Sequence, residues 1–155
     1  MVLTAREPLR LPLLTAALSA AFGALAQTAA TDAPSIRDGV FTAEQARRGR
    51  IAYTGPCDRC HGYLLDGASD DPDMLPAPPV AGPKFLRKWN GRTLAALFEY
   101  VRTTMPANNP GYLSEAEVAD IVAYMLSVSG MPAGGEALQP DPEALARIVL
   151  EPVAD

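Results

Sequence analysis

Several residue types that bind metals or build large cores are scarce in this sequence of 155 residues. It contains one histidine, His61, two cysteines, Cys57 and Cys60, one tryptophan and only 6% aromatic residues. A structural zinc site needs four nitrogen or sulfur ligands, and these three residues are too few to supply them. Fifteen prolines beside so few aromatic residues predict long irregular segments and a small core. A core of this kind often depends on a cofactor for part of its stability.

Long apolar runs are absent after the first 26 residues. Arg6 and Arg10 precede the apolar run "LPLLTAALSAAFGA" at residues 11–24, and the small-residue pattern "ALA" ends this stretch. The alternative, a membrane anchor, would need about 20 apolar residues, whereas a short run with basic flanks is typical of an export signal. We therefore expect residues 1–26 to be a signal peptide cleaved near Ala26. The mature chain would be periplasmic, with no stable membrane insertion.

Positive charge is not in excess, because 13 Lys and Arg residues stand against 18 Asp and Glu residues and the net charge is −5. Nucleic acid is therefore not an expected partner. Between residues 103 and 155 the sequence has eight acidic residues and a single basic one, Arg147, while the other basic residues lie earlier. Such a polarised surface can steer a protein partner, although a solvated surface without a partner explains it equally well.

No segment alternates apolar and polar residues as a strand does, and the apolar spacing is that of helices. We predict helices over residues 42–53, 93–103 and 114–127, and a short one near 142–150. Thr42 with Gln45, and Ser114 with Glu117, have the spacing of capping boxes, and Gly130 can end the third helix in a left-handed conformation. The fold is expected to be all-α, with residues 27–40 as a linker and 63–83 as a long loop.

The cysteines and the histidine form the motif Cys-x-x-Cys-His at residues 57–61. Two thiols at i and i+3 of a helical turn can attach to the two vinyl groups of one haem, and the following imidazole then projects toward the iron. We therefore predict that Cys57 and Cys60 bind haem c covalently and that His61 is an axial ligand. A redox dithiol would need a βαβ context, which is missing, and a disulfide across two residues would close too short a loop to stabilise much.

A methionine is the natural second axial ligand, because the sequence has no other histidine. Besides Met105, the methionines are Met1, Met74, Met125 and Met131. Met105 precedes Pro106, and a proline forces an extended backbone on the residue before it. The thioether is then presented from a loop rather than buried in a helix face. We predict Met105 as the ligand, with Met74 and Met131 as the alternatives.

With these features in this order, residues 41–130 resemble a class I bacterial cytochrome c, the small class with a single haem. The resemblance implies a small cytochrome c fold, in which the N- and C-terminal helices cross around one covalently bound haem. Gly49 and Tyr53 match the glycine and the aromatic residue of the first helix at this crossing. Ile121 and Tyr124 of the last helix would meet them there.

The resemblance also implies three haem contacts outside the motif. Pro78, in "PPVAG", matches the proline whose carbonyl group accepts the ring N–H of the haem histidine. Trp89 resembles the tryptophan that donates a hydrogen bond to a haem propionate, with core packing as the alternative role. Arg92 could neutralise the same propionate, with a solvated arginine as the alternative.

Residues 131–155 depart from the small class, and they are similar to the C-terminal extensions of cytochromes that work with quinoprotein dehydrogenases. The resemblance implies an electron carrier rather than an enzyme. It would take one electron at a time from a periplasmic dehydrogenase, for which the quinoprotein type is a candidate, and pass it to a cytochrome or an oxidase. The alternative is a haem subunit of an oxidoreductase complex, or a peroxidase-like enzyme with a displaceable sixth ligand.

Overall fold

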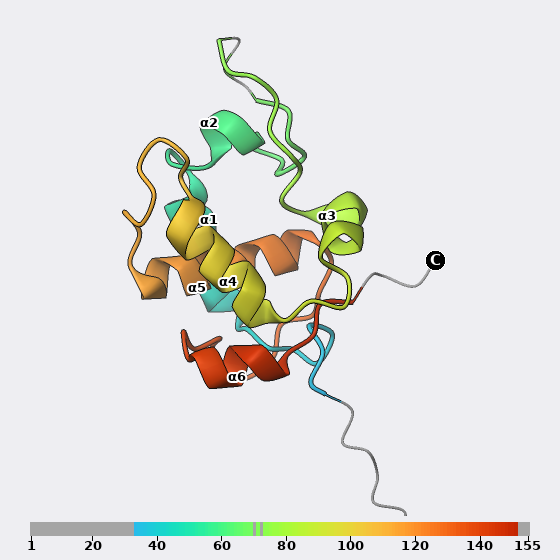
Figure 1. Ribbon diagram of the computed structural model, residues 1–155. Coiled ribbons are helices and arrows are strands. Elements are labelled where there is room, and N and C mark those ends of the chain that lie inside the picture. Colours follow the sequence, from blue (N-terminus) through green and yellow to red (C-terminus); the bar gives the residue numbers. More distant parts are fainter. Residues whose placement is uncertain (1–32, 70, 72, 152–155) are drawn as a thin grey trace, which may run out of the picture. The chain divides into compact units, whose positions relative to one another are not determined.

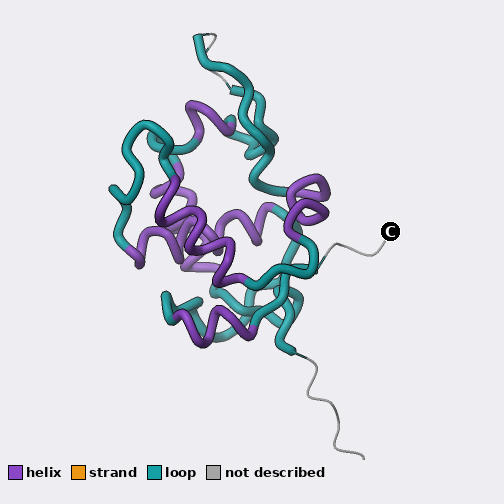
Figure 2. The backbone as a smooth tube through the Cα atoms, in the orientation of Figure 1, coloured by secondary structure: helices purple, strands orange, loops and turns teal. Residues whose placement is uncertain are grey.

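The computed structural model describes residues 33–151 except 70 and 72, and this part of the chain folds into helices (Figure 1). They are α1 (Ala43–Tyr53), α2 (Asp58–His61), α3 (Gly82–Trp89), α4 (Leu94–Thr104), α5 (Glu115–Val128) and α6 (Pro142–Arg147). Strand pairing among the described residues is limited to two isolated bridges, which Val149 makes with Ser35 and with Thr93. The all-α prediction is confirmed, as the helices and connecting loops in Figure 2 show.

The signal peptide predicted for residues 1–26 lies outside the described residues. Among the residues described, no helix has the length and apolarity needed to cross a membrane.

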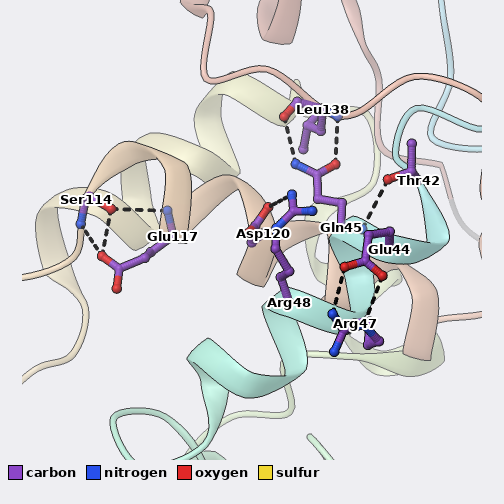
Figure 3. A network of polar contacts seen from close by, with 9 residues as sticks. All are labelled: Thr42, Glu44, Gln45, Arg47, Arg48, Ser114, Glu117, Asp120 and Leu138. Carbon is purple, nitrogen blue, oxygen red and sulfur yellow. Dashed lines mark hydrogen bonds and ion pairs between the residues drawn. The ribbon is translucent and has the colours of Figure 1, made fainter.

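Helices α1 and α5 pack across each other. Gly49 of α1 permits the close approach, because a Cβ atom at this position would lie 1.8 Å from the carbonyl oxygen of Asp120 in α5. Next to this contact the rings of Tyr53 and Tyr124 pack edge to face, with centroids 5.6 Å apart. The Arg48 guanidinium donates two hydrogen bonds of 2.8 Å to the Asp120 carboxylate (Figure 3). The predicted helix crossing is therefore present, with Tyr124 at the contact.

Helices α1 and α5 begin at the predicted capping residues. Ser114 and Glu117 form the expected reciprocal capping box, and the Thr42 hydroxyl oxygen accepts a hydrogen bond of 3.1 Å from the backbone N–H of Gln45. The Gln45 side chain, however, does not reach back to Thr42. Its buried amide donates to the carbonyl oxygen of Leu138 at 2.8 Å and accepts from the N–H of Leu138 at 2.7 Å (Figure 3). The prediction of a full capping box at Thr42 is therefore wrong for the Gln45 side chain, because the backbone of Leu138 offers it two buried partners.

The segment after α5 packs back onto the helices. Three of its leucines are buried in the core: Leu138, Leu145 and Leu150. Helix α6 contacts α4, and Leu150 pairs through its backbone with the turn between α3 and α4. The N–H of Gly91 donates to the Leu150 carbonyl oxygen at 2.9 Å, and the N–H of Leu150 donates to that of Arg92 at 2.9 Å. The described residues of the predicted C-terminal extension, 131–155, therefore belong to the same folded core.

The described part of the predicted linker, residues 33–40, is also folded. Ile36 is fully buried, and its N–H donates a hydrogen bond of 3.1 Å to the carbonyl oxygen of Val149. The N–H of Val149 in turn donates to the carbonyl oxygen of Pro34 at 2.8 Å. The two segments that flank residues 41–130 thus hold each other in place.

Helix α3 was not predicted, because its sequence "GPKFLRKW" begins at the end of a proline-rich loop. Pro83 lies in the first turn of α3, where a helix has no use for its missing N–H. Phe85, Leu86 and Trp89 form the buried side of this helix. The loop predicted over residues 63–83 therefore ends at Ala81.

Candidate haem site

Helix α2 brings the two cysteines and the histidine together on a single turn. The N–H of His61 donates a hydrogen bond of 2.9 Å to the carbonyl oxygen of Cys57, which closes the turn. The Asp58 carboxylate accepts from the N–H of Gly55 at 2.9 Å and so fixes the entry to the helix. Both cysteines are free and half-buried. Because residues at i and i+3 are neighbours on a helix surface, Cys57 and Cys60 can serve one ligand.

The thiol of Cys57 is not activated. Burial, the nearby Asp58 carboxylate and Cys60 raise the pKa of this thiol to about 12. Catalytic and redox cysteines have a lowered pKa, because the thiolate is the reactive form. At neutral pH Cys57 is therefore protonated, which argues against a redox dithiol. A thioether carries no ionisable proton, so its burial at this position would have no such electrostatic cost.

The His61 ring is oriented by the loop that follows α2. Its Nδ1 lies 2.8 Å from the carbonyl oxygen of Pro78. A carbonyl oxygen can only accept, so Nδ1 must carry the proton and donate it in this hydrogen bond. In the neutral ring the other nitrogen, Nε2, then carries the lone pair, and this is the tautomer that a metal ligand requires. The contact predicted for Pro78 is thus present in the structure.

Backbone hydrogen bonds on both sides of Pro78 hold this carbonyl group in place. The N–H of Val80 donates to the carbonyl oxygen of Leu65 at 2.9 Å, and the N–H of Ala77 donates to that of Gly67 at 3.2 Å. At Gly67 the backbone φ is 85°, and a Cβ atom would lie 2.1 Å from the Ala77 carbonyl oxygen, so only glycine fits. Leu65 and Gly67 were not among the residues predicted to support the site. The glycine in "LLDGAS" was the only local signal for them.

Met105 lies at the C-terminal end of α4. Its backbone is extended, with φ −121° and ψ 150°, as expected for a residue that precedes a proline. Its N–H donates to the carbonyl oxygen of Val101 at 3.0 Å. The side chain is half-buried at the edge of the core. Met125 and Met131 are only 3% and 7% exposed and pack within the core. Among the described methionines, this leaves Met105 and the half-buried Met74 available to a ligand.

Trp89 and Arg92 are stacked on each other. The Trp89 ring is buried, its centroid lies 5.7 Å from that of Tyr100, and the guanidinium carbon of Arg92 lies 4.1 Å above it. Core packing accounts for the position of Trp89, and a cation–π contact accounts for that of Arg92. A hydrogen bond or ion pair from either side chain to a haem propionate stays a prediction.

The donor atoms of this site fit a covalently bound haem. They comprise two free thiols, an imidazole whose Nδ1 faces the Pro78 carbonyl oxygen, and a thioether, and all four side chains are half-buried rather than packed inside the core. Cys57 and Cys60 would hold the haem, and His61 and Met105 would provide the axial ligands. Thioether and imidazole together form a known ligand pair of c-type haem iron.

Comparison with known proteins places the chain in a family. No curated protein matches the sequence. The crystal structure of the sulfane dehydrogenase SoxCD from Paracoccus pantotrophus aligns at 20% identity and a TM-score of 0.41, over 78% of this chain and 62% of that chain. This chain therefore spans less than two thirds of the solved chain, and the likeness is too distant to bear on function.

Residues 44–125, more than half of the chain, match the family described as cytochrome c oxidase, cbb3-type, subunit III. The match covers α1 to most of α5 and includes the Cys-x-x-Cys-His turn and Met105. It confirms the resemblance to a cytochrome c, and with it the covalently bound haem c and a role in electron transfer. The chain therefore belongs to this family of c-type cytochromes.

Proposed function

We propose that the chain is a periplasmic one-electron carrier whose haem is anchored by Cys57 and Cys60 and ligated by His61 and Met105. The haem supplies reversible one-electron chemistry between ferric and ferrous iron. The observation that supports this proposal most strongly is the 2.8 Å contact between His61 Nδ1 and the Pro78 carbonyl oxygen. This hydrogen bond fixes the tautomer and the ring orientation of His61 and raises the basicity of Nε2.

The supports of the two ligands favour a carrier over a peroxidase-like enzyme. His61 is held by the α2 turn and by Pro78, and the backbone of Met105 is held by Val101. Groups fixed in advance need little rearrangement when the charge of the site changes. A peroxidase-like enzyme would instead need a displaceable ligand and a second acid–base side chain, and His61 is the sole histidine of the sequence.

The proposed electron donor is a periplasmic dehydrogenase, with the quinoprotein type as a candidate, and the proposed acceptor is another cytochrome or an oxidase. This assignment depends on export through residues 1–26. Intact mass spectrometry of periplasmic protein should give the mass of the chain cleaved near Ala26 plus one haem. Affinity purification of the tagged chain from the periplasm should recover a dehydrogenase. An uncleaved chain confined to the cytoplasm would contradict the location.

The ligand assignment is tested by Met105→Ala, with Met74→Ala as the matched control. We expect the ferric holoprotein of Met105→Ala to lose the weak far-red band of methionine–iron charge transfer, to bind cyanide and to have a lower reduction potential. The potential falls because a thioether favours ferrous iron. Met74→Ala should leave the spectrum and the potential unchanged. If the band survives in Met105→Ala and disappears in Met74→Ala, the ligand is Met74. A high-spin wild-type protein that binds CO readily would favour the enzyme.

A further inference from the structure

Helix α3 presents three cations on its exposed side. Lys84, Arg87 and Lys88 lie at positions i, i+3 and i+4, so they share one side of the helix, opposite the buried Phe85 and Leu86. All three are exposed, and none forms an ion pair with a described residue. Like charges at this spacing repel each other, and no ion pair with a described residue offsets that repulsion.

The stability of α3 explains only part of this pattern. Arg87 and Lys88 lie in the last turn, where a cation interacts favourably with the helix dipole. Lys84 lies in the first turn, where the dipole disfavours positive charge, and α3 has no acidic residue there to offset it. Lys84 therefore destabilises the helix that carries it.

An open hollow of about 530 Å³ lies beside these cations. Lys84 and Arg87 line it, and Asp66 is the sole acidic residue of the lining. Most of the lining is apolar, and its two largest apolar side chains are exposed, Leu64 at 71% and Val128 at 43%. Exposed apolar side chains bordered by charge are typical of protein–protein contact sites.

The hollow is linked to His61, the proposed iron ligand, through Pro79 and Pro78. Pro79 lines the hollow and follows Pro78, whose carbonyl oxygen accepts the hydrogen bond of 2.8 Å from His61. One hydrogen bond and one peptide unit therefore lead from the His61 ring to this surface.

We propose that this surface is the docking site of an electron-transfer protein that presents carboxylates around an apolar centre. The surface, called the α3 face below, consists of Lys84, Arg87, Lys88, Leu64, Pro79 and Val128. The chain has a net charge of −5 and repels an acidic partner in general. Unpaired cations beside an apolar hollow reverse that repulsion locally and orient the encounter. The inference rests on the proposed electron-carrier function.

The first test measures the oxidation of ferrous holoprotein by hexacyanoferrate(III), which takes up the single electron that the protein loses. The variant is Lys84→Glu with Arg87→Glu. The control is Arg50→Glu with Arg147→Glu, which makes the same change in net charge at exposed positions of α1 and α6. We expect the α3 variant to react about tenfold more slowly at low ionic strength, with a smaller loss in the control. The difference should vanish in high salt, because salt screens exposed charges.

The second test needs no electron transfer. Hexacyanocobaltate(III), which has the same shape and charge but is redox-inert, is titrated into ¹⁵N-labelled holoprotein. Amide shifts should centre on α3 and Leu64, and they should disappear in the α3 variant. Shifts that centre on Arg50 or Arg147, or equal losses of rate in both variants, would overturn the docking site. A holoprotein without a reversible one-electron couple in voltammetry would overturn the proposed function itself, whatever these anions bind.

Discussion

Replacing Gly49 with alanine tests the packing of α1 against α5. The added methyl group would lie 1.8 Å from the carbonyl oxygen of Asp120 and 2.9 Å from Cβ of Tyr124, whereas unstrained contacts between carbon atoms are about 3.5 Å. The nearest atom belongs to the backbone of α5, so it cannot rotate away as a side chain could. The two helices would have to separate by roughly 1 Å or more to restore an ordinary contact.

The expected loss of stability follows from three contributions. Overpacking costs about 1–3 kcal/mol, and a backbone obstacle places this case at the upper end. Separation of the helices also weakens the edge-to-face contact between Tyr53 and Tyr124, which adds about 1 kcal/mol. The better helix propensity of alanine returns about 1 kcal/mol. We expect Gly49→Ala to lower the free energy of unfolding by about 3 kcal/mol.

Urea unfolding of the ferric holoprotein measures this loss, with the m-value as a check that unfolding stays two-state. Gly135→Ala is the matched control, because no atom lies within 4 Å of the added methyl group and the backbone there is not left-handed. The control should change the unfolding free energy by less than about 0.5 kcal/mol. Equal stabilities of Gly49→Ala and the wild type would refute the close approach of α1 and α5.

Two other variants test contacts within the fold. Gln45→Leu should lower the free energy of unfolding, measured in urea, by about 2–4 kcal/mol, because the buried N–H and carbonyl groups of Leu138 lose their partners. An unchanged midpoint of urea unfolding would show that Gln45 does not hold the C-terminal segment at Leu138. Ser114→Ala should cost about 1 kcal/mol. The Ser114 hydroxyl and N–H donate hydrogen bonds to the Glu117 carboxylate and hold its pKa below the ordinary value of 4.5. The stabilisation by these two hydrogen bonds is therefore fully present above pH 4.5, and it is lost as the pH falls through the lowered pKa. The variant should therefore lose less stability than the wild type on acidification in urea titrations, and parallel curves would contradict the capping box.

The sequence predicts the helices well where the signals are local. The helix predicted over residues 93–103 is observed as Leu94–Thr104, and the one predicted over 114–127 is observed as Glu115–Val128. Gly130 ends α5 as expected, with φ at 83° and the N–H of Met131 bonded to the carbonyl oxygen of Leu126 at 3.1 Å. Caps and apolar periodicity depend on residues within a few positions of each other, so they can be read directly from the sequence.

The predictions that failed depend on residues far apart in the sequence. Gln45 has the spacing of a capping box, but its amide bonds to Leu138, which is 93 positions away. Two buried hydrogen bonds to a backbone outweigh one exposed contact to an N-cap. Likewise, the apolar residues of α3 do not stand out in a segment dominated by prolines, and the helix gains its stability from tertiary packing.

The same distinction applies to the site. The Cys-x-x-Cys-His motif and Met105-Pro106 are adjacent residues, so the chemistry of the donor atoms was accessible from the sequence. Pro78 came from a family resemblance, and the backbone bonds that hold it, from Leu65 and Gly67, required the structure. The sequence does not indicate a docking role for exposed cations such as Lys84, because only the structure shows that they form no ion pair with a described residue.

The folded unit is larger than the cytochrome segment that identifies it. The family match ends at residue 125, inside α5. The α3–α4 turn, which carries Arg92 and lies within the match, is nevertheless hydrogen-bonded to Leu150, which lies beyond it. Ile36, before the match, is buried, and its N–H donates a hydrogen bond to the carbonyl oxygen of Val149, after the match. Because Arg92 stacks on Trp89, the position of both proposed propionate contacts depends on the last described residues of the chain. The C-terminal segment therefore holds the α3–α4 turn in place, at the opposite end of α3 from Pro78 and the hollow.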